Sequence, residues 1–228
     1  MIQTILSVAA IIATVAVFAS SIPAVREIER SRTTGATSIV PYVAGIVNCV
    51  LWTSYGLLIS DPTQIIVNGI GSGLYIYYLT IYFSYTNDAV TARRTTLLGF
   101  CYIAAAFTWV GGMSTTRAEV TWNLGIVGAL TTILFFAAPL SLLVRIVKTK
   151  STDGLSRPLA WLGCLVCMLW VAYGRNDPFV WQPNALGLLL SLCQVALLFL
   201  YPSTSPSNDS SNGQGPMGSS GLHISLGK

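Results

Sequence analysis

Long apolar stretches alternate along the chain with short charged segments. Asp, Glu, Lys, Arg and His are absent from seven stretches, which are residues 1–25, 33–60, 62–87, 95–116, 120–144, 158–174 and 178–208. A helix needs roughly 17–25 apolar residues to cross a hydrocarbon core about 30 Å thick, and each stretch contains such a length. The continuous apolar runs lack the period-two alternation of a barrel strand. The pattern therefore predicts an all-α membrane protein with seven transmembrane helices.

The distribution of positive charge predicts how this bundle is oriented. Hydrophobic residues make up 53% of the 228 residues and charged residues only 9%, unlike an ordinary soluble domain. All but two of the 12 Lys and Arg residues follow the first, third, fifth or seventh predicted helix, and the exceptions are Arg117 and Arg175. The positive-inside rule then places the N-terminus outside the cytosol and the C-terminus in it. The same asymmetry accounts for the net charge of +4, so we expect no nucleic-acid partner.

An internal repeat appears when the sequence is compared with itself at an offset of 116 to 118 residues. The aligned pairs are Pro23 with Pro139, Pro41 with Pro158, Trp52 with Trp170, Tyr55 with Tyr173, Asp61 with Asp177, and Asn68 with Asn184. Ordered identities at one period indicate a duplicated structural unit. We predict a first three-helix repeat at 1–86, a linker helix at 95–116 and a second three-helix repeat at 120–201.

The linker helix determines the relative orientation of the two repeats. Three spans plus one return the chain to its starting side, so both repeats face the same way and are parallel. Parallel repeats pack about an axis along the membrane normal and enclose a central pathway between them. Residues 202–228 are rich in Ser, Gly, Asn and Pro, which predicts a disordered cytoplasmic tail.

From Ile5 to about Tyr201 the sequence resembles the SWEET family of sugar uniporters, which are parallel-repeat transporters. The resemblance rests on residues 34–38 (Thr-Gly-Ala-Thr-Ser) with Pro41, on the two Trp-x-x-Tyr-Gly motifs, on Asn68-Gly69, and on residues 183–187 (Pro-Asn-Ala-Leu-Gly). It implies a 3+1+3 bundle of PQ-loop type that carries mono- or disaccharides without ion coupling. We expect a bidirectional uniporter that works by alternating access.

The resemblance also implies roles for particular residues. The substrate-binding positions of the family fall on Asn68, Asn184, Trp52, Trp170 and Asn48, and the repeat counterpart of Asn48 is Val166. A tetrad of hinge prolines falls on Pro23, Pro41, Pro139 and Pro158, and an outer gate falls on Tyr55 and Asp177. Asn48 together with Leu134, five residues before Pro139, is similar to the monosaccharide-preferring members, so glucose is the expected kind of substrate.

The chemistry of the two residue pairs agrees with a sugar ligand. Carboxamides both donate and accept hydrogen bonds without carrying charge, as sugar hydroxyls require, so Asn68 and Asn184 suit the task. The alternative is that each asparagine only bonds a neighbouring helix. Trp52 and Trp170 could pack on the apolar faces of a sugar ring, and the alternative for them is a place in the aromatic belt at the membrane interface.

The four prolines have two interpretations. A proline inside a helix removes an amide donor and crowds the carbonyl one turn earlier, which favours a kink where bending is easy. Alternatively, prolines simply mark helix starts, and this applies most strongly to Pro41 and Pro158. Pro23 and Pro139 come after longer stretches of apolar residues, so they are the better candidates for hinges.

The remaining chemistry excludes several function classes. The predicted spans contain no titratable acid or base, which argues against ion-coupled transport and against an intramembrane enzyme. The five cysteines lack companion ligands, so we expect neither a metal nor a cofactor. The alternatives are a PQ-loop carrier of another metabolite such as an amino acid, or a receptor or scaffold that transports nothing. We expect a multi-pass protein of the plasma membrane, with an internal membrane as the alternative.

One small-residue motif bears on oligomeric state. Gly69 and Gly73 form a G-x-x-x-G pattern, which permits close approach of two helices. The contact could lie within a repeat, which we favour, or between the protomers of a homo-oligomer.

Overall fold

A computed structural model describes residues 1–201, and the predicted tail at 202–228 lies outside the described residues. The described part is helical and contains no strand. Its elements are α1 (Ile2–Ala19), α2 (Ile22–Ser31), α3 (Val40–Ile59), α4 (Pro62–Tyr85), α5 (Ala89–Gly112), α6 (Arg117–Phe135), α7 (Ala137–Thr149), α8 (Arg157–Tyr173) and α9 (Pro178–Leu200). The predicted all-α class is confirmed.

Nine helices correspond to seven predicted spans within the described residues, because two spans are broken. The first span is divided into α1 and α2 at Ser20 and Ser21, and the fifth is divided into α6 and α7 at Phe136. Six segments are long and apolar enough to cross a membrane, with these two broken spans counted as one each. α8 is apolar and 17 residues long, which is the lower end of the spanning range.

The breaks follow from the proline positions. Pro23 lacks the N–H that would bond to the carbonyl of Ala19, and Pro139 lacks the one that would bond to Phe135. Each proline then lies in the first turn of the next helix, where its missing donor is tolerated. Pro41 and Pro158 also lie in first turns, those of α3 and α8, but at the start of a whole span. The prediction that Pro23 and Pro139 differ from the other two is therefore consistent with the helix bounds.

Capping side chains fix the starts of the helices that follow loops. Asp61 Oδ1 accepts hydrogen bonds from the backbone N–H groups of Thr63 and Gln64 at the start of α4. Asp177 Oδ1 accepts from the N–H of Phe179 at the start of α9. A capping carboxylate satisfies helix donors that would otherwise be orphaned. The two aspartates occupy repeat-related positions, so both halves begin their last helix in the same way.

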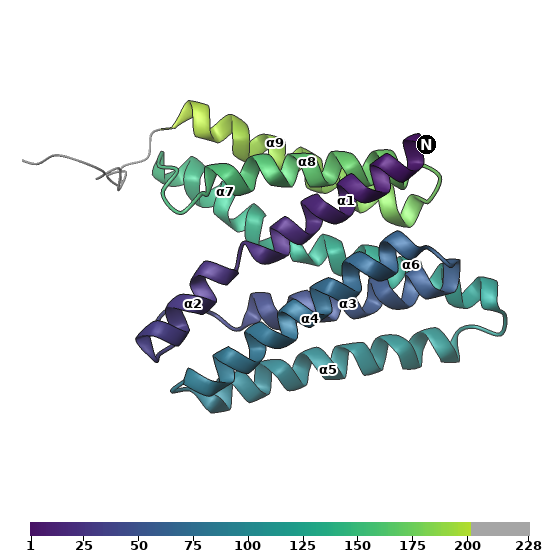
Figure 1. Ribbon diagram of the computed structural model, residues 1–228, viewed down its shortest axis with the longest axis horizontal. Helices are drawn as coiled ribbons and strands as arrows, with labels where there is room; N and C mark the ends of the chain where they lie inside the picture. The colour runs from purple at the N-terminus through teal and green to yellow at the C-terminus, as the bar shows by residue number, and fades with distance from the viewer. Residues whose placement is uncertain (202–228) are drawn as a thin grey trace, which may run out of the picture.

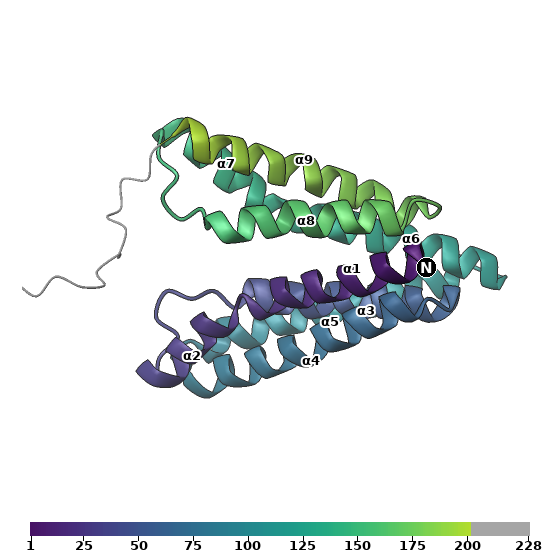
Figure 2. The same ribbon diagram turned by 45° about the horizontal axis from the view of Figure 1, so that its top comes forward.

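The helices pack as two groups that meet along α1, α3, α6 and α8. Within the first group α3 packs on α4, within the second α8 packs on α9, and α5 lies against α3 and α6. Between the groups α1 packs on α8 and α3 packs on α6, which are equivalent contacts under the repeat. In Figures 1 and 2 the groups lie close together near the N-terminal end of α1, and their ribbons diverge toward α2 and α7.

Two buried clusters support this arrangement. One lies where the two groups meet and contains Leu51, Trp52, Tyr55, Trp170 and Val180. The other lies within the first group and connects α2, α3 and α4 through side chains that include Val25, Ile28, Tyr42 and Tyr78. The half-helix α2 is thus packed onto its own group and away from the other one.

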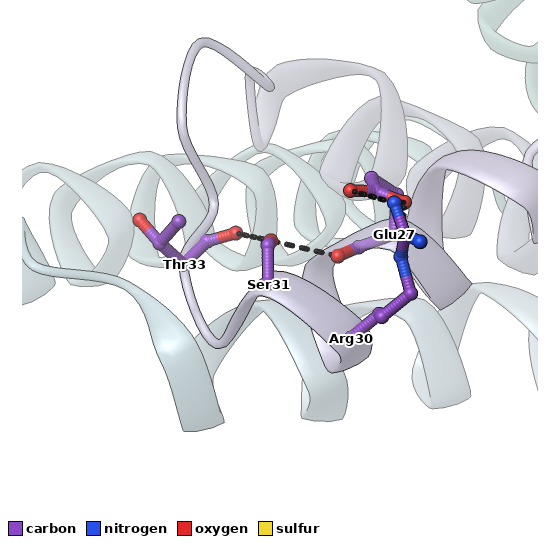
Figure 3. Close-up of polar contacts among 4 residues, drawn as sticks. All are labelled: Glu27, Arg30, Ser31 and Thr33. Carbon is purple, nitrogen blue, oxygen red and sulfur yellow. Dashed lines mark hydrogen bonds and ion pairs between the residues drawn. The ribbon is translucent and has the colours of Figure 1, made fainter.

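The end of α2 is held by local polar contacts, as Figure 3 shows. Arg30 forms an ion pair with Glu27 at 3.0 Å, and the Ser31 hydroxyl lies 2.7 Å from the carbonyl oxygen of Glu27 and 3.2 Å from that of Thr33. Both charged side chains are more than half exposed, and pairs of that kind contribute little stability. These contacts shape the turn after α2 and lie outside the region between the two groups.

Candidate functional site

A cavity of about 330 Å³ lies between the two helix groups. All five predicted substrate-binding residues line it: Asn48, Trp52, Asn68, Trp170 and Asn184. The lining contains no Asp, Glu, Lys, Arg or His, and its polar groups are carboxamides, hydroxyls, thiols and indole N–H groups. The cavity is therefore polar in places and uncharged throughout its described lining.

The two asparagines occupy equivalent positions on α4 and α9. The side-chain amide of Asn68 donates to the carbonyl of Gln64 at 2.9 Å, and that of Asn184 donates to the carbonyl of Val180 at 2.7 Å. Each carboxamide thus donates one hydrogen bond to a backbone carbonyl of its own helix, one turn earlier. No described residue bonds either side-chain oxygen, and neither oxygen is a buried unsatisfied atom, so both are reachable from the cavity. Each asparagine therefore has an acceptor to offer a ligand, and Asn184 has a further donor. The amide nitrogen of Asn68 also lies 3.5 Å from the side-chain oxygen of Gln64.

The two tryptophans are part of the core between the groups. Each is 7% exposed, whereas the exposed fractions of Trp109, Trp122, Trp161 and Trp181 range from 36% to 59%. Their burial excludes the aromatic-belt alternative for Trp52 and Trp170. The exposure of the four other tryptophans agrees with a place in that belt. Trp52 stacks edge-on against Tyr55 and Trp170 against Tyr173, with ring centroids 5.5 and 5.6 Å apart.

Two threonines hold the tryptophans and were not identified from the sequence. The indole N–H of Trp52 donates to the hydroxyl of Thr132 at 2.9 Å, and that of Trp170 donates to Thr14 at 2.9 Å. Both bonds cross between the groups, and both threonines line the cavity. Thr14 and Thr132 stand 118 residues apart, so the repeat offset was the signal that could have found them.

The two sides of the cavity differ next to these bonds. The hydroxyl of Thr132 lies 3.1 Å from the side-chain oxygen of Asn48, and 3.0 Å from the carbonyl of Gly128. The repeat counterpart of Asn48 is Val166, which also lines the cavity and has no such oxygen. The polar surface therefore extends further on the Asn48 side.

The structure places Leu134, which the resemblance linked to substrate preference, outside the cavity. Leu134 is 67% exposed and does not line the cavity, whereas its neighbour Phe135 does. A shift of one residue turns a side chain by about 100° around a helix, so the predicted position lies on the outer face of α6. Phe135 is the repeat counterpart of Val17, and both contribute to the lining.

The predicted outer pair is in contact, and the structure adds its repeat counterpart. The hydroxyl of Tyr55 donates to a carboxylate oxygen of Asp177 at 2.7 Å. The hydroxyl of Tyr173 lies 2.8 Å from a carboxylate oxygen of Asp61 and 2.8 Å from the hydroxyl of Thr63. These two Tyr–Asp contacts join the groups at the end of the cavity near the N-terminus of α1. The sequence comparison had aligned all four residues, but only one pairing was expected.

The second of these contacts belongs to a larger network. The hydroxyl of Ser7 lies 2.7 Å from that of Thr63, and the side-chain amide of Gln3 donates to the carbonyl of Tyr173 at 3.1 Å. Both additional residues come from α1. This end of the molecule is therefore bridged by α1, α3 and α8, together with the caps of α4 and α9.

The four prolines of the predicted tetrad are not part of the cavity lining. Pro23 and Pro139 lie just beyond the breaks described above, and Pro41 and Pro158 begin helices. A fifth proline, Pro183, lies inside α9 next to Asn184 and is fully buried. Its missing N–H leaves the carbonyl of Phe179 without its helical partner.

Both predicted repeats match one known protein family. Residues 4–89 and 123–205 match the family described as sugar efflux transporter for intercellular exchange. Sugar transporter SWEET1 of Drosophila pseudoobscura pseudoobscura is 34% identical over 201 residues, which cover 87% of this chain and 89% of that protein. SWEET1 of Rattus norvegicus is 31% identical over 206 residues, covering 88% and 91% of the two chains.

A plant relative and a solved structure agree with these matches. The bidirectional sugar transporter SWEET7 of Arabidopsis thaliana is 31% identical over 197 residues, covering 81% of this chain and 74% of that protein. The solved 3.7 Å structure of a eukaryotic SWEET transporter has a TM-score of 0.77 at 24% identity, with 86% of this chain and 94% of that chain covered. The likeness to that structure confirms the fold.

Proposed function

Since the chain belongs to the family of sugar efflux transporters for intercellular exchange, the SWEET family, we propose that it carries a small sugar across a membrane in either direction, down the concentration gradient. The chain is a multi-pass membrane transporter, not an enzyme. The observation that carries the proposal is the uncharged polar cavity between the two helix groups, lined by paired asparagines and tryptophans.

The size of the cavity favours a monosaccharide such as glucose. Small-molecule sites commonly measure about 300–1,000 Å³, and the cavity of about 330 Å³ lies at the small end of that range. In this proposal Asn68 and Asn184 bond the sugar hydroxyls, and Trp52 and Trp170 flank the cavity with aromatic surface. Asn48 adds a polar group on one side, so the sugar binds in a preferred orientation.

Transport is proposed to proceed by alternating access without ion coupling. The Tyr–Asp contacts hold the two groups together at one end, and the groups diverge at the other, which suits a carrier open to one side (Figure 2). The breaks near Pro23 and Pro139 let α2 and α7 move relative to α1 and α6, while Pro41 and Pro158 fix the starts of the adjoining spans. Coupling to an ion needs a charged or titratable site near the substrate, and the cavity lining has none.

The proposed orientation rests on the charge distribution. We propose that the N-terminus and the Tyr–Asp contacts lie on the extracytoplasmic side, and that the ends of α2 and α7 face the cytosol. The plasma membrane is the proposed location. Gly69 and Gly73 have nothing within 4 Å of where a Cβ would stand, so they face outward from α4 and the favoured contact within a repeat is wrong. Their outward position leaves a homo-oligomer compatible with this arrangement.

Sugar uptake by cells that express the chain tests the proposed function. We expect uptake of glucose above that of control cells, and loss of most of it in the Asn68→Ala and Asn184→Ala variants. Asn123→Ala is the matched control, because Asn123 bonds Ser114 and lies outside the cavity. Full uptake in both cavity variants would refute the asparagine assignment alone. A chain that reaches the membrane and carries no sugar, but does carry an amino acid, would support the other PQ-loop reading.

A further inference from the structure

Two phenylalanines mark the helix breaks and line the cavity. Phe18 is the second-last residue of α1, and Phe136 separates α6 from α7. The two stand 118 residues apart, and both belong to the cavity lining. Their rings therefore lie where the half-helices α2 and α7 diverge from the rest of their spans.

Each ring lies against a glycine of the last helix in its own repeat. A Cβ built on Gly71 of α4 would stand 2.6 Å from Cε2 of Phe18 and 2.7 Å from the sulfur of Cys49. A Cβ built on Gly187 of α9 would stand 2.7 Å from Cζ of Phe136 and 2.9 Å from the sulfur of Cys167. Real Cβ atoms do not approach other atoms so closely, so only glycine accommodates the ring and the thiol as they stand.

Backbone conformation does not explain these glycines. In the part of the chain that the structure describes, positive φ among glycines occurs at Gly35 and Gly154, and neither Gly71 nor Gly187 is among them. A glycine within a helix is about 1 kcal/mol less favourable than alanine. Close approach of the aromatic ring is the physical reason that remains for both positions.

The surroundings limit where the rings could go. On the first side Phe18 packs edge-on against Tyr75, with ring centroids 5.6 Å apart, and its carbonyl accepts a hydrogen bond from Tyr78 at 3.0 Å. Tyr75 in turn fills the space over Gly45, where a Cβ would lie 2.3 Å from its ring. The repeat counterparts of Tyr75 and Gly45 are Ser191 and Gly163, so the second side has a smaller neighbour there. A Phe18 ring displaced from Gly71 would therefore move toward the cavity.

We propose that Gly71 and Gly187 are positioning residues that set the largest sugar the cavity admits, because each seats a phenylalanine ring out of the pathway at a helix break. The proposal rests on the proposed function and extends it to a determinant of substrate size. An added methyl group at either glycine narrows the cavity through the ring and the thiol. The narrowing discriminates against wider solutes and leaves the hydrogen-bonding asparagines untouched.

The test compares solutes of two widths in vesicles containing the purified chain. Initial uptake rates of glucose and of the four-carbon polyol erythritol are measured for Gly71→Ala and Gly187→Ala. We expect the ratio of glucose to erythritol uptake to fall roughly tenfold, the scale of an overpacked site, with KM for glucose raised. Gly69→Ala and Gly73→Ala are matched controls on the same helix, because nothing lies within 4 Å of either Cβ position, and we expect them to keep the unsubstituted ratio.

A second substitution separates ring displacement from general damage. Phe18→Leu combined with Gly71→Ala, and Phe136→Leu combined with Gly187→Ala, remove the far edge of the ring that the new methyl group meets. Both double variants should regain at least half of the unsubstituted ratio. Phe18→Leu and Phe136→Leu alone should raise uptake of the wider disaccharide sucrose relative to glucose. These two variants test whether the rings limit the pathway even where an alanine variant does not fold.

An unchanged glucose-to-erythritol ratio in both alanine variants would overturn the proposal, and so would equal losses for both solutes with no rescue. If the leucine variants leave the sucrose-to-glucose ratio unchanged, the rings do not limit the pathway and the proposal fails. If these variants fail to show the expected changes but the unsubstituted chain takes up glucose normally, the proposed function remains intact. If the unsubstituted chain carries no sugar, the proposed function fails first and this proposal falls with it.

Discussion

Single residues in the cavity share their hydrogen-bonding groups between the scaffold and a ligand. Each asparagine spends one donor on its own helix, and each tryptophan spends its only donor on a threonine of the other helix group. Rings and carboxamides are thus held in fixed positions before a sugar arrives. Preorganisation of this kind reduces the entropy lost on binding.

Removal of the tryptophan acceptors should weaken sugar binding. Thr132→Val leaves the Trp52 indole N–H without its partner and removes the contact with Asn48. A buried donor left unsatisfied costs about 1–3 kcal/mol, so we expect KM for sugar to rise roughly 5- to 150-fold. Uptake kinetics in vesicles measure the change.

The repeat supplies a graded comparison for this effect. Thr14→Val removes the acceptor of Trp170 on the side where Val166 replaces asparagine, so we expect a smaller rise in KM. Thr132→Ser and Thr14→Ser retain the hydroxyl and should stay close to the unsubstituted KM. Equal KM values for all four variants would show that the indole bonds do not position the rings for binding.

The asparagines and tryptophans of the site could be predicted from the sequence, but the threonines that bond the tryptophans could not. The asparagines and tryptophans were identified because they recur at the repeat offset, and the structure brings all four to one cavity. Thr14 and Thr132 recur at the same offset, yet threonine is common in apolar helices and its role depends on which helix packs opposite. The outward position of Leu134 was not predictable, because the direction of a side chain on α6 depends on the rotation of the helix, which the apolar run of that span does not specify.

Two kinds of helix end determine how the elements can move. At one end the caps of α4 and α9 also accept hydrogen bonds from tyrosines of the other group. At the other end the first and fifth spans are broken beside a proline. The first arrangement joins the groups, and the second permits bending within them, so the elements suit a molecule that opens at one side while closed at the other.

Loss of the Tyr–Asp contacts should expose the cavity from the N-terminal side. A hydrogen bond to a charged group contributes about 1.5–3 kcal/mol, so Tyr55→Phe together with Tyr173→Phe should shift the balance of states toward outward opening. The readout is labelling by a thiol reagent applied from outside to a cysteine placed at Val180, which lines the cavity and is 4% exposed. The five native cysteines, two of which line the cavity, are first replaced by serine. We expect faster labelling in the double variant than in either single one.

The control for this experiment is a tyrosine whose hydrogen bond does not join the two helix groups. Tyr82 donates to the carbonyl of Thr37 within the first group, so Tyr82→Phe should leave outside labelling unchanged. Labelling of the double variant at the unsubstituted rate would contradict the assignment of these contacts as an outer gate.

Asp177 combines a helix cap with a contact between groups, and two substitutions separate the functions. Asp177→Asn keeps one oxygen that can cap α9, but it removes the charge and puts an NH2 group in place of the second oxygen, which accepts from Tyr55. Asp177→Ala removes both, and loss of a cap alone costs about 1 kcal/mol. We expect a lower midpoint of thermal unfolding for the alanine variant than for the asparagine variant, measured on purified protein. Equal midpoints would show that the cap contributes nothing measurable to stability.

The elements themselves were largely predictable. Seven charge-free stretches correspond to seven spans, since a charge at membrane depth is costly and the loops must hold it. The breaks were expected as kinks at Pro23 and Pro139, but their positions a few residues earlier depend on which carbonyl each proline leaves without a donor. The second Tyr–Asp contact arises from packing of α8 against the first group, which sequence periodicity does not report.

The whole molecule is a pair of similar helix groups joined by α5, with a cavity between them (Figure 1). Contacts between α1 and α8 match those between α3 and α6, so the two groups meet in nearly symmetric fashion. The symmetry is broken inside the cavity by Asn48, whose repeat counterpart is Val166, and by Tyr75, whose counterpart Ser191 does not line the cavity. A carrier built in this way can rock about its centre while it binds a sugar in one orientation.

The most direct test of the account is sugar flux through purified protein in vesicles under imposed ion gradients. The account predicts that labelled glucose enters until the inside and outside concentrations are equal, and that neither a proton nor a sodium gradient changes the final level. Preloaded unlabelled glucose should speed entry of label by exchange. Accumulation above the outside concentration driven by either ion, or entry no faster than into empty vesicles, would contradict it.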